Sequence, residues 1–575
     1  MVTGLGEADA DADALEGAAE AQAAEEASDG VHFAQEGILR RQSLRESAAR
    51  TYARALPIVP VRARGLTIEG ADGRRYLDCL SGAGTLVLGH NHPVVLEAIR
   101  KVLDSGAPLH AVDLATPVKD AFVTELFRTL PPGLADRARV RFCGPAGTDA
   151  VQAAFQLVRS ATGRDGMLAF TGAHHGTITG ALEAPGDAVG SRIAPLPYPQ
   201  EYRCPFGVGG ARGAELAARW AESVLDAPKS GLPLPAGVIL EPVQIEGGVL
   251  PAPDAWMRRM RKITAARSVP LIADEIRTGV GRTGAFWAVD HSGVTPDVMI
   301  LSNAIGGSLP LAALVYRDDL DAGEPGTPAD AFPGNQLAMA AGAATLSYVR
   351  ENSLAERAGT LGSRMLNQLR ALAREFSIVG DVRGRGLMIG IELVEAEGDF
   401  GTARAEAGTG PEAVAGTWAG GGASLGDQVG LGGSDDCGVS TFAGAGTGAG
   451  AAAGAGHDGG WVPSTGLGSV GAGRPAGSPR PAAPHLAAAV QRECLRRGLI
   501  VELGGRHTSV VRLLPPLTIT DEQATAVLDR LADAVEAVAR NHARGEQTHP
   551  QRPRQPRRPQ HPQPGRPGDR AERAG

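Results

Sequence analysis

The sequence predicts an α/β protein, with a mostly parallel central sheet in a large domain and a second, smaller α+β domain. From about residue 90 to 320, short runs rich in strand-forming residues alternate with stretches of helical periodicity. Strands that alternate with helices favour right-handed crossovers and a sheet whose two faces are both covered. From 335 to 540 the order changes to helices, a strand, a Gly/Ala-rich stretch, a helix, two strands and a final helix. This second order is typical of an α+β domain.

Five strands and two helices are expected in the core of the large domain. The expected strands are residues 138–144, 237–243, 269–276, 297–302 and 311–317. The expected helices are 148–161, after a Gly-rich turn, and 252–267, which should start after an Asp cap. Ligands bind at the carboxyl ends of strands in such sheets, so the polar residues that follow these strands are the candidates for chemistry.

In the smaller domain, the helical stretch 336–374 should break near residue 353, and a strand is expected over 386–394. The elements expected after the Gly/Ala-rich stretch are a helix at 485–498, strands at 499–505 and 509–517, and a helix at 520–540. The last helix begins with "TDEQ", which is the pattern of a capping box.

Three segments lack the large apolar side chains that a core needs. Residues 1–30 are acidic and Ala-rich, 396–485 are dominated by Gly and Ala, and 543–575 are basic and rich in Pro, Arg and Gln. We expect all three to be disordered, because they cannot bury enough apolar surface to offset chain entropy. The domain boundaries that follow are 31–89 for an N-terminal part of the small domain, 90–330 for the large domain, and 331–395 with 486–542 for the rest of the small domain.

Composition bears on the compartment and the partners. The net charge of −8 argues against nucleic acid as the main partner. The five cysteines are odd in number and show no CxxC spacing, which indicates a reducing compartment and no metal site. The N-terminus has no secretory pattern, and no apolar stretch reaches the ~18 residues of a membrane-spanning helix. We therefore expect a cytoplasmic protein without a membrane segment.

Two groups at strand ends could contact a cofactor. In "RFCGPAGTDA", a strand, a Gly-rich turn and a helix that begins near Gly147 and Thr148 would present free N–H groups to a phosphate. The structural alternative is an ordinary strand–helix turn. In "LIADEI", Asp274 ends a buried strand and needs a partner, which could be a protonated ring nitrogen or simply one of the many arginines.

Other polar groups suggest a substrate site. Glu241 and Glu246 follow a strand in "EPVQIEGG", and Arg512 lies in the small domain. Arginine binds a carboxylate through two hydrogen bonds, although Arg512 could equally be a surface strand residue. His174 and His175 are adjacent on an extended segment, so their side chains point in opposite directions and a shared metal is not expected.

The order of these motifs resembles that of the class III aminotransferases, which have the fold-type I architecture and use pyridoxal 5′-phosphate (PLP). The resemblance covers nearly all of 35–395 and 485–540. The stretches "LSGAGTLVLGHNHP", "GVILEPVQIEGG", "ADEIRTGVGRTGAFWA" and "AIGGSLPLAALV" are most similar to the diaminobutyrate–2-oxoglutarate transaminase branch. Enzymes of this branch move a terminal amino group to 2-oxoglutarate.

The resemblance implies a role for each matching residue. Gly147 and Thr148 would hold the PLP phosphate, and Asp274 would pair with the pyridinium nitrogen and keep the ring an electron sink. Ile276 would pack on one face of the ring and His174 on the other.

The resemblance also implies a substrate site and a dimer. Glu241 and Glu246 would contact substrate, and Glu246 would pair with Arg512 and release it when a dicarboxylate arrives. The family is dimeric, with the active site at the subunit interface. A homodimer, or a heterodimer with a paralogue, is therefore expected.

Five positions depart from the family pattern, and all five face the cofactor. Asn303 stands in place of the Schiff-base lysine, and Arg277 in place of a glutamine that would contact the PLP phenolic oxygen. His174 replaces a stacking aromatic residue. Ala146 replaces a serine beside the phosphate, and Ala331 replaces a threonine that would reach the partner subunit's phosphate.

The missing lysine changes the expected chemistry. Lysine would anchor PLP, exchange it to the substrate amine and move the proton, and an asparagine amide can do none of these near neutral pH. The four lysines of the chain, Lys101, Lys119, Lys229 and Lys262, all lie outside the cofactor motifs. We therefore expect PLP to be held without a covalent bond, if it binds, and aminotransferase activity to be impaired or lost.

Several alternatives stay open from the sequence. Asn303 could be an isolated change in a working enzyme, or His174 or His175 could serve as the base. A catalytically inactive protein could instead act as the binding partner of an active paralogue. The basic tail could bind an anionic partner.

Overall fold

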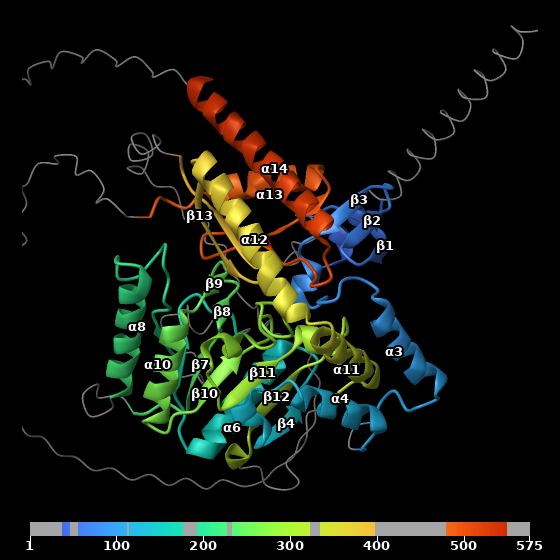
Figure 1. Cartoon of the computed structure of the whole chain (residues 1–575), viewed down its shortest axis with the longest axis vertical. Coiled ribbons are helices and arrows are strands. Elements are labelled where there is room, and N and C mark those ends of the chain that lie inside the picture. The colour runs from blue at the N-terminus through green and yellow to red at the C-terminus, as the bar shows by residue number, and fades with distance from the viewer. Residues whose placement is uncertain are drawn as a thin grey trace, which may run out of the picture. The chain divides into compact units, whose positions relative to one another are not determined.

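Seven strands form the central sheet, in the order β4-β12-β11-β10-β7-β5-β6 (Figure 1). Their bounds are β4 Ala138–Phe142, β5 Met167–Phe170, β6 Ile193–Leu196, β7 Gly237–Leu240, β10 Leu271–Asp274, β11 Val298–Leu301 and β12 Ala313–Arg317. Neighbouring strands are parallel, except that β12 runs antiparallel to both β11 and β4. The predicted α/β class with a mostly parallel sheet is confirmed.

The structure is a computed structural model and describes part of the chain. The described residues are 37–46, 56–111, 114–175, 193–226, 233–321, 334–396 and 479–548. The N-terminal segment 1–30 and Ala331 lie outside these ranges, as do Lys229, residues 397–478 of the Gly/Ala-rich segment and residues 549–575 of the tail.

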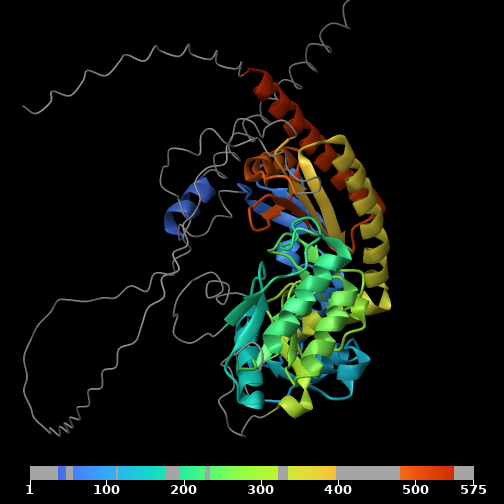
Figure 2. The ribbon, with the colours of Figure 1, turned by 90° about the vertical axis from the view of Figure 1, so that its left-hand side faces the viewer.

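Helices cover both faces of the central sheet, as the alternating pattern predicts: α6 Gly147–Thr162 lies on one face, and α8 Gly210–Leu225 and α10 Asp254–Ala265 lie on the other. The other helices of this part are α3 Pro93–Asp104, α4 Pro117–Phe127 and α5 Pro132–Ala135. Ile239, Ile272 and Ile300 belong to the buried cluster that contains α6. Their neighbours Leu240 and Leu301 belong to the cluster on the other face, which contains α8 and α10. In Figure 2, α8 and α10 face the viewer and lie side by side.

Two smaller four-stranded sheets flank the C-terminal helices. One has the order β1-β2-β3-β15 and the other β13-β14-β17-β16, and β8 pairs with β9 in a separate two-stranded ribbon. The bounds are β1 Pro60–Arg64, β2 Thr67–Gly70, β3 Arg75–Asp78, β8 Val243–Gln244, β9 Leu250–Pro251, β13 Val379–Arg385, β14 Met388–Leu393, β15 Leu499–Ile500, β16 Glu502–Gly504 and β17 Val510–Leu513. The helices of this part are α11 Gln336–Glu351, α12 Leu354–Glu375, α13 Pro484–Arg496 and α14 Asp521–Thr548.

The structure differs from the sequence prediction at one strand and at one helix cap. The single strand expected at 499–505 is two strands, because β15 pairs in parallel with β3 while β16 pairs with β17. The chain passes from one sheet to the other at the buried Val501. The Asp cap expected for the helix at 252–267 is absent: Pro253 occupies the N-cap of α10, and Asp254 is the first helical residue.

Helix ends agree with local sequence signals at two other places. The break between α11 and α12 falls at Ser353, which has a left-handed backbone (φ +49°). At the start of α14, the side chains of Thr520 and Gln523 each accept a hydrogen bond from the other's backbone N–H, as in a capping box. Helix α14 continues to Thr548, past the expected start of the tail at 543, because the first proline that could stop it is Pro550.

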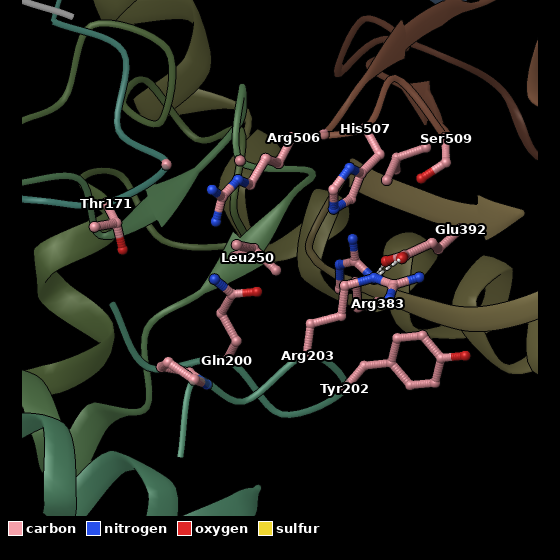
Figure 3. A pocket seen from close by; sticks show the side chains of 15 residues that line it. Thr171, Gln200, Tyr202, Arg203, Leu250, Arg383, Glu392, Arg506, His507 and Ser509 are labelled. Carbon is pink, nitrogen blue, oxygen red and sulfur yellow. Dashed lines mark hydrogen bonds and ion pairs between the residues drawn. The ribbon is translucent and has the colours of Figure 1, made fainter. Parts of the chain in front are cut away.

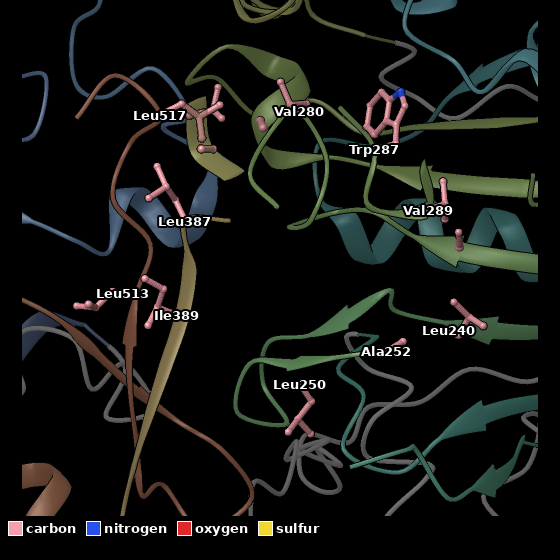
Figure 4. Packing of buried hydrophobic residues seen from close by; sticks show 14 of the residues in the cluster. Leu240, Leu250, Ala252, Val280, Trp287, Val289, Leu387, Ile389, Leu513 and Leu517 are labelled. Atoms are coloured by element: carbon pink, nitrogen blue, oxygen red, sulfur yellow. The ribbon is translucent and has the colours of Figure 1, made fainter. Parts of the chain in front are cut away.

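One hydrophobic core joins the central sheet to the smaller sheets. Figure 4 shows Ile389 of β14 and Leu513 of β17 on one side, and Leu240 of β7 and Trp287 on the other; all four belong to the same buried cluster. The described residues of both expected domains therefore belong to one compact unit. Among the described helices, none is long and apolar enough to cross a membrane.

Candidate active site

A cavity of about 160 Å³ lies where the strand ends of the central sheet meet the N-terminus of α6. Its lining residues are Gly147, Thr148, Val151, His174, His175, Glu241, Ile245, Glu246, Asp274, Ile276, Arg277, Thr278 and Asn303. The structure thus brings together candidate residues from five separate segments of the chain. Arg512 is not part of the lining but contacts it through Glu246.

The N-terminus of α6 forms one wall of the cavity. Gly147 is the first helical residue, and a Cβ added there would lie 2.8 Å from Cδ1 of Ile276. This close packing leaves the backbone N–H groups of Gly147 and Thr148 at the cavity, where the first turn of a helix has no internal partners for them. Ala146 at the N-cap adds no hydroxyl, and Asp149 accepts a hydrogen bond from its backbone N–H (3.1 Å).

Asp274 is a buried carboxylate at the end of β10. Its side chain is 4% exposed, and its Oδ2 lies 2.8 Å from Nδ1 of His175. Its Oδ1 accepts a hydrogen bond from the backbone N–H of Ile276 (3.1 Å). These two contacts fix the orientation of the carboxylate at the cavity wall.

Glu241 is a second buried carboxylate, at the end of β7. Burial, together with the negative charge of Asp274, raises the pKa of Glu241 well above its usual range. The backbone N–H of His174 donates a weak hydrogen bond to its Oε2 (3.4 Å). The environment therefore favours the protonated form of Glu241 beside the ionisable Asp274.

Glu246 lies between two arginines. Its Oε1 is 2.6 Å from Nη1 of Arg277, and its Oε2 is 3.0 Å from Nη1 of Arg512. Burial acts to raise the pKa of Glu246, but the charges of Arg512 and Arg277 outweigh it and lower the pKa. Arg512 is almost fully buried, and its Nη2 also lies 2.9 Å from Oε2 of Glu502. The Arg512 guanidinium is thus held between two carboxylates.

Asn303 occupies the turn after β11. Its backbone is left-handed (φ +53°), and it begins a short 3-10 turn, Asn303–Gly306. The side-chain Nδ2 lies 3.5 Å from the carbonyl oxygen of Ala83. Asparagine is one of the few non-glycine residues that adopt this conformation readily, so it suits the backbone at this place.

No described lysine lines the cavity. Lys101 pairs with Glu97 on α3, and the ammonium of Lys119 lies over the ring of Phe142. Lys262 is exposed on α10. Within the described part of the chain, the cavity therefore contains no amine that could form a covalent bond with an aldehyde.

The residues present fit the non-covalent contacts of PLP, the cofactor that the resemblance implies. A Cβ at Gly147 would crowd Cδ1 of Ile276, and the N–H groups of Gly147 and Thr148 suit a phosphate. Asp274 is a buried carboxylate suited to a protonated ring nitrogen. The covalent contact does not fit, because Asn303 carries no amine.

Three contacts of the site were not predicted from the sequence. They are His175 with Asp274, Arg277 with Glu246, and Glu502 with Arg512. The last could have been found from strand register, since Glu502 of β16 is directly opposite Arg512 of β17. The other two depend on contacts between segments far apart in the chain, for which no local signal exists.

Comparisons with known proteins agree with this geometry. A family model described as aminotransferase class-III matches residues 48–410. The chain is 43% identical over 513 residues to a diaminobutyrate–2-oxoglutarate aminotransferase of Rhizobium meliloti (strain 1021), covering 88% of this chain and 93% of that protein. It is 44% identical over 367 residues to a protein of the same name from Haemophilus influenzae, covering 62% of this chain and 80% of that protein.

Solved structures with the same fold are more distant in sequence. An (S)-enantioselective omega-transaminase from Thermomicrobium roseum has a TM-score of 0.65 at 21% identity, covering 88% of this chain and 98% of that one. An ornithine aminotransferase from Toxoplasma gondii has a TM-score of 0.63 at 19% identity, covering 88% and 96%. At this level of identity the likeness bears on the fold alone.

Proposed function

The chain belongs to the class III aminotransferases. From this premise we propose that it is an enzyme of the diaminobutyrate–2-oxoglutarate transaminase type and that its amino-transfer activity is impaired or lost. The observation that carries the proposal is Asn303, which lines a cavity that otherwise gathers the expected cofactor and substrate residues. The substrate class is supported by two relatives, 43% and 44% identical, that are named diaminobutyrate–2-oxoglutarate aminotransferases.

The proposed cofactor is PLP, held without a covalent bond. The N–H groups of Gly147 and Thr148 would donate to its phosphate, and the Asp274 carboxylate would accept from its ring nitrogen. Ile276 would pack against one face of the ring and His174 would lie on the other. When bound, PLP supplies an electron sink for the substrate carbon that bears the amine.

With asparagine at position 303, the chain lacks a lysine amine there for the covalent and proton-transfer steps. An amide nitrogen is neither a nucleophile nor a base near neutral pH. It can therefore neither attack an aldehyde carbon nor carry a proton between carbon atoms. Ala146 removes a further contact, because a missing hydrogen bond to a charged phosphate costs about 1.5–3 kcal/mol of affinity.

On the substrate side, Arg512 would bind a carboxylate of 2-oxoglutarate once Glu246 moves away. One contact opposes this movement in the present chain, because Arg277 holds the other oxygen of Glu246. Glu502 instead holds Arg512 in place from its other side. We therefore infer that Glu246 separates from Arg512 less readily than it would if Arg512 were its only partner.

Restoring the amine tests the proposal. The assay is formation of glutamate from 2,4-diaminobutyrate and 2-oxoglutarate with added PLP, for the natural chain, Asn303→Lys and Asn303→Gln. We expect turnover to rise only in Asn303→Lys, since Asn303→Gln keeps the amide and changes only its length. Turnover by the natural chain equal to that of Asn303→Lys would refute the proposal. Residual activity that is lost in His174→Phe would assign the base to His174, whose pKa is lowered by burial.

The second candidate function is a non-catalytic subunit that pairs with an active paralogue. The retained fold and the assembled cavity around Asn303 support it, because such a subunit needs the dimer surface but no lysine. Co-expression with a lysine-containing paralogue tests it. A stable heterodimer whose activity exceeds that of the paralogue alone is the expected result.

A further inference from the structure

A second cavity, of about 250 Å³, lies at the end of the β16–β17 hairpin (Figure 3). Its walls come from the hairpin turn, from the segment around Gln200 and Arg203, and from strands β13 and β14. Gly247, next to Glu246 of the first cavity, also lines it. The two cavities therefore lie on either side of one short segment.

The lining of this second cavity is positively charged. Three arginines and one glutamate line it, so its net formal charge is +2 with the histidine neutral. The glutamate, Glu392, has a side chain only 3% exposed and already pairs with Arg203 and with Nη1 of Arg383 (2.6 Å). The one acidic side chain of the lining is thus neutralised within the wall.

One arginine and one histidine side chain remain available to a ligand. Arg506 and His507 are exposed at the hairpin turn, and neither forms an ion pair within the described part of the chain. Figure 3 shows both side chains extending from the turn toward Gln200 and Arg383. The side chains of Thr171 and Ser509 add hydroxyl groups to the same lining.

The hairpin turn that carries these side chains has a defined geometry. Gly505 and Thr508 both have left-handed backbones (φ +81° and +54°), and the N–H of Thr508 donates to the carbonyl of Gly505 (2.8 Å). The N–H of Gly505 donates to the carbonyl of Glu246 (3.0 Å). Arg506 and His507 are therefore presented from a turn that is hydrogen-bonded to the wall of the first cavity.

We propose that this cavity is a second binding site, which takes a small dianion with carboxylate or phosphate oxygens. A guanidinium group binds either anion through two parallel hydrogen bonds, and Arg506 is placed for this role. His507 and the amide of Gln200 supply further donors. The site depends neither on Asn303 nor on PLP, so it goes beyond the proposed function.

Calorimetric titration of the full-length chain tests this site. The probes are inorganic phosphate and succinate, with neutral succinamide as the control ligand, in a low-salt buffer. The key variant is Arg506→Gln/His507→Gln, whose side chains are exposed, so that folding is unaffected. Arg492→Gln, an exposed arginine on α13, is the matched control, and Gly147→Ala, whose added Cβ crowds the N-terminus of α6, perturbs the first cavity only.

We expect phosphate or succinate to bind, with affinity lowered about tenfold or more in the double variant and unchanged in Arg492→Gln and Gly147→Ala. Binding of phosphate alone indicates a phosphate ester as the natural ligand, and binding of succinate alone indicates a dicarboxylate. Equal affinity in the natural chain and the double variant would overturn the proposal. So would a loss confined to Gly147→Ala, or the absence of binding by both probes.

Discussion

At position 303, the backbone conformation suits asparagine, but the proposed cofactor chemistry needs an amine that asparagine lacks. The turn after β11 requires a left-handed residue, and asparagine adopts that conformation with little strain. Its amide also reaches the carbonyl of Ala83 at 3.5 Å. In the proposed account, asparagine at this position keeps the local fold but supplies no amine for covalent attachment of PLP.

Arg277 is expected to control the release of Glu246. In Arg277→Gln, one of the two charged contacts of Glu246 is lost, so Glu246 can leave Arg512 more easily. We expect 2-oxoglutarate to bind about tenfold more tightly, which corresponds to one charged hydrogen bond. Calorimetry with Arg258→Gln, on α10 away from the cavity, as the control variant measures this. Weaker binding in Arg277→Gln would mean instead that Arg277 itself holds the substrate.

Glu275 is expected to make folding stability depend on pH. Burial raises its pKa from 4.5 to about 7, although hydrogen bonds from Thr278 and the N–H of Val289 partly oppose this. The folded chain therefore keeps a proton that the unfolded chain has lost between these two values. The stabilisation is full below pH 4.5 and is lost as the pH rises through 7, with a slope of about −1.4 kcal/mol per pH unit.

Urea unfolding at pH 5, 6 and 7 measures this slope. Glu275→Gln keeps the shape of the side chain and cannot ionise, so its free energy of unfolding should fall less between pH 5 and 7 than that of the natural chain. Glu201→Gln, at an exposed position, is the control. Parallel pH curves for the natural chain and Glu275→Gln would show that Glu275 does not titrate in this range.

At the scale of elements, strands buried on both faces were the most predictable. Runs such as 297–302 are apolar, short and bounded by turns, which a local pattern can show. The division of 499–505 into β15 and β16 could not be predicted, because it depends on pairing with β3 and β17, which lie elsewhere in the sequence. The antiparallel direction of β12 could not be predicted either, because it is defined by the pairing of β12 with β4 and β11.

The same distinction holds for the candidate site. Residues at strand ends, such as Glu241 and Asp274, could be found because parallel strands deliver their carboxyl ends to one edge. The contacts of Arg277 with Glu246 and of His175 with Asp274 could not, since each joins segments without a shared local pattern.

The two ends of α6 are expected to respond differently to the same substitution. At the N-terminus, Gly147→Ala puts a Cβ within 2.8 Å of Ile276 and disturbs the phosphate seat. PLP affinity should fall about tenfold, with little change in stability. At the C-terminus, Gly163 has φ +65° and open space around it, so Gly163→Ala should cost ~1–2 kcal/mol of stability and leave PLP affinity unchanged.

Absorbance titration with PLP and urea unfolding of both variants check this pair. If Gly147→Ala binds PLP with the affinity of the natural chain, the N-terminus of α6 is not part of the cofactor site.

At the scale of the whole molecule, one core joins the sheet that supplies Asp274 to the smaller sheet that supplies Arg512. Cofactor binding should therefore stabilise the described fold as a unit. With PLP at 100 times its dissociation constant, the expected gain is about 2.7 kcal/mol, and dialysis should reverse it because no covalent bond forms. Thermal unfolding before addition, after addition and after dialysis measures this. A gain that survives dialysis would point to covalent attachment.

The most direct test of a pocket without a lysine is borohydride reduction in the presence of PLP, followed by intact mass and peptide mapping. Asn303→Lys serves as the positive control and should gain one reduced cofactor per chain, on residue 303. In the natural chain, we expect no stoichiometric gain in mass and no lysine labelled selectively. One reduced cofactor per chain, on a single lysine of the natural protein, would contradict the central claim that no lysine serves this site.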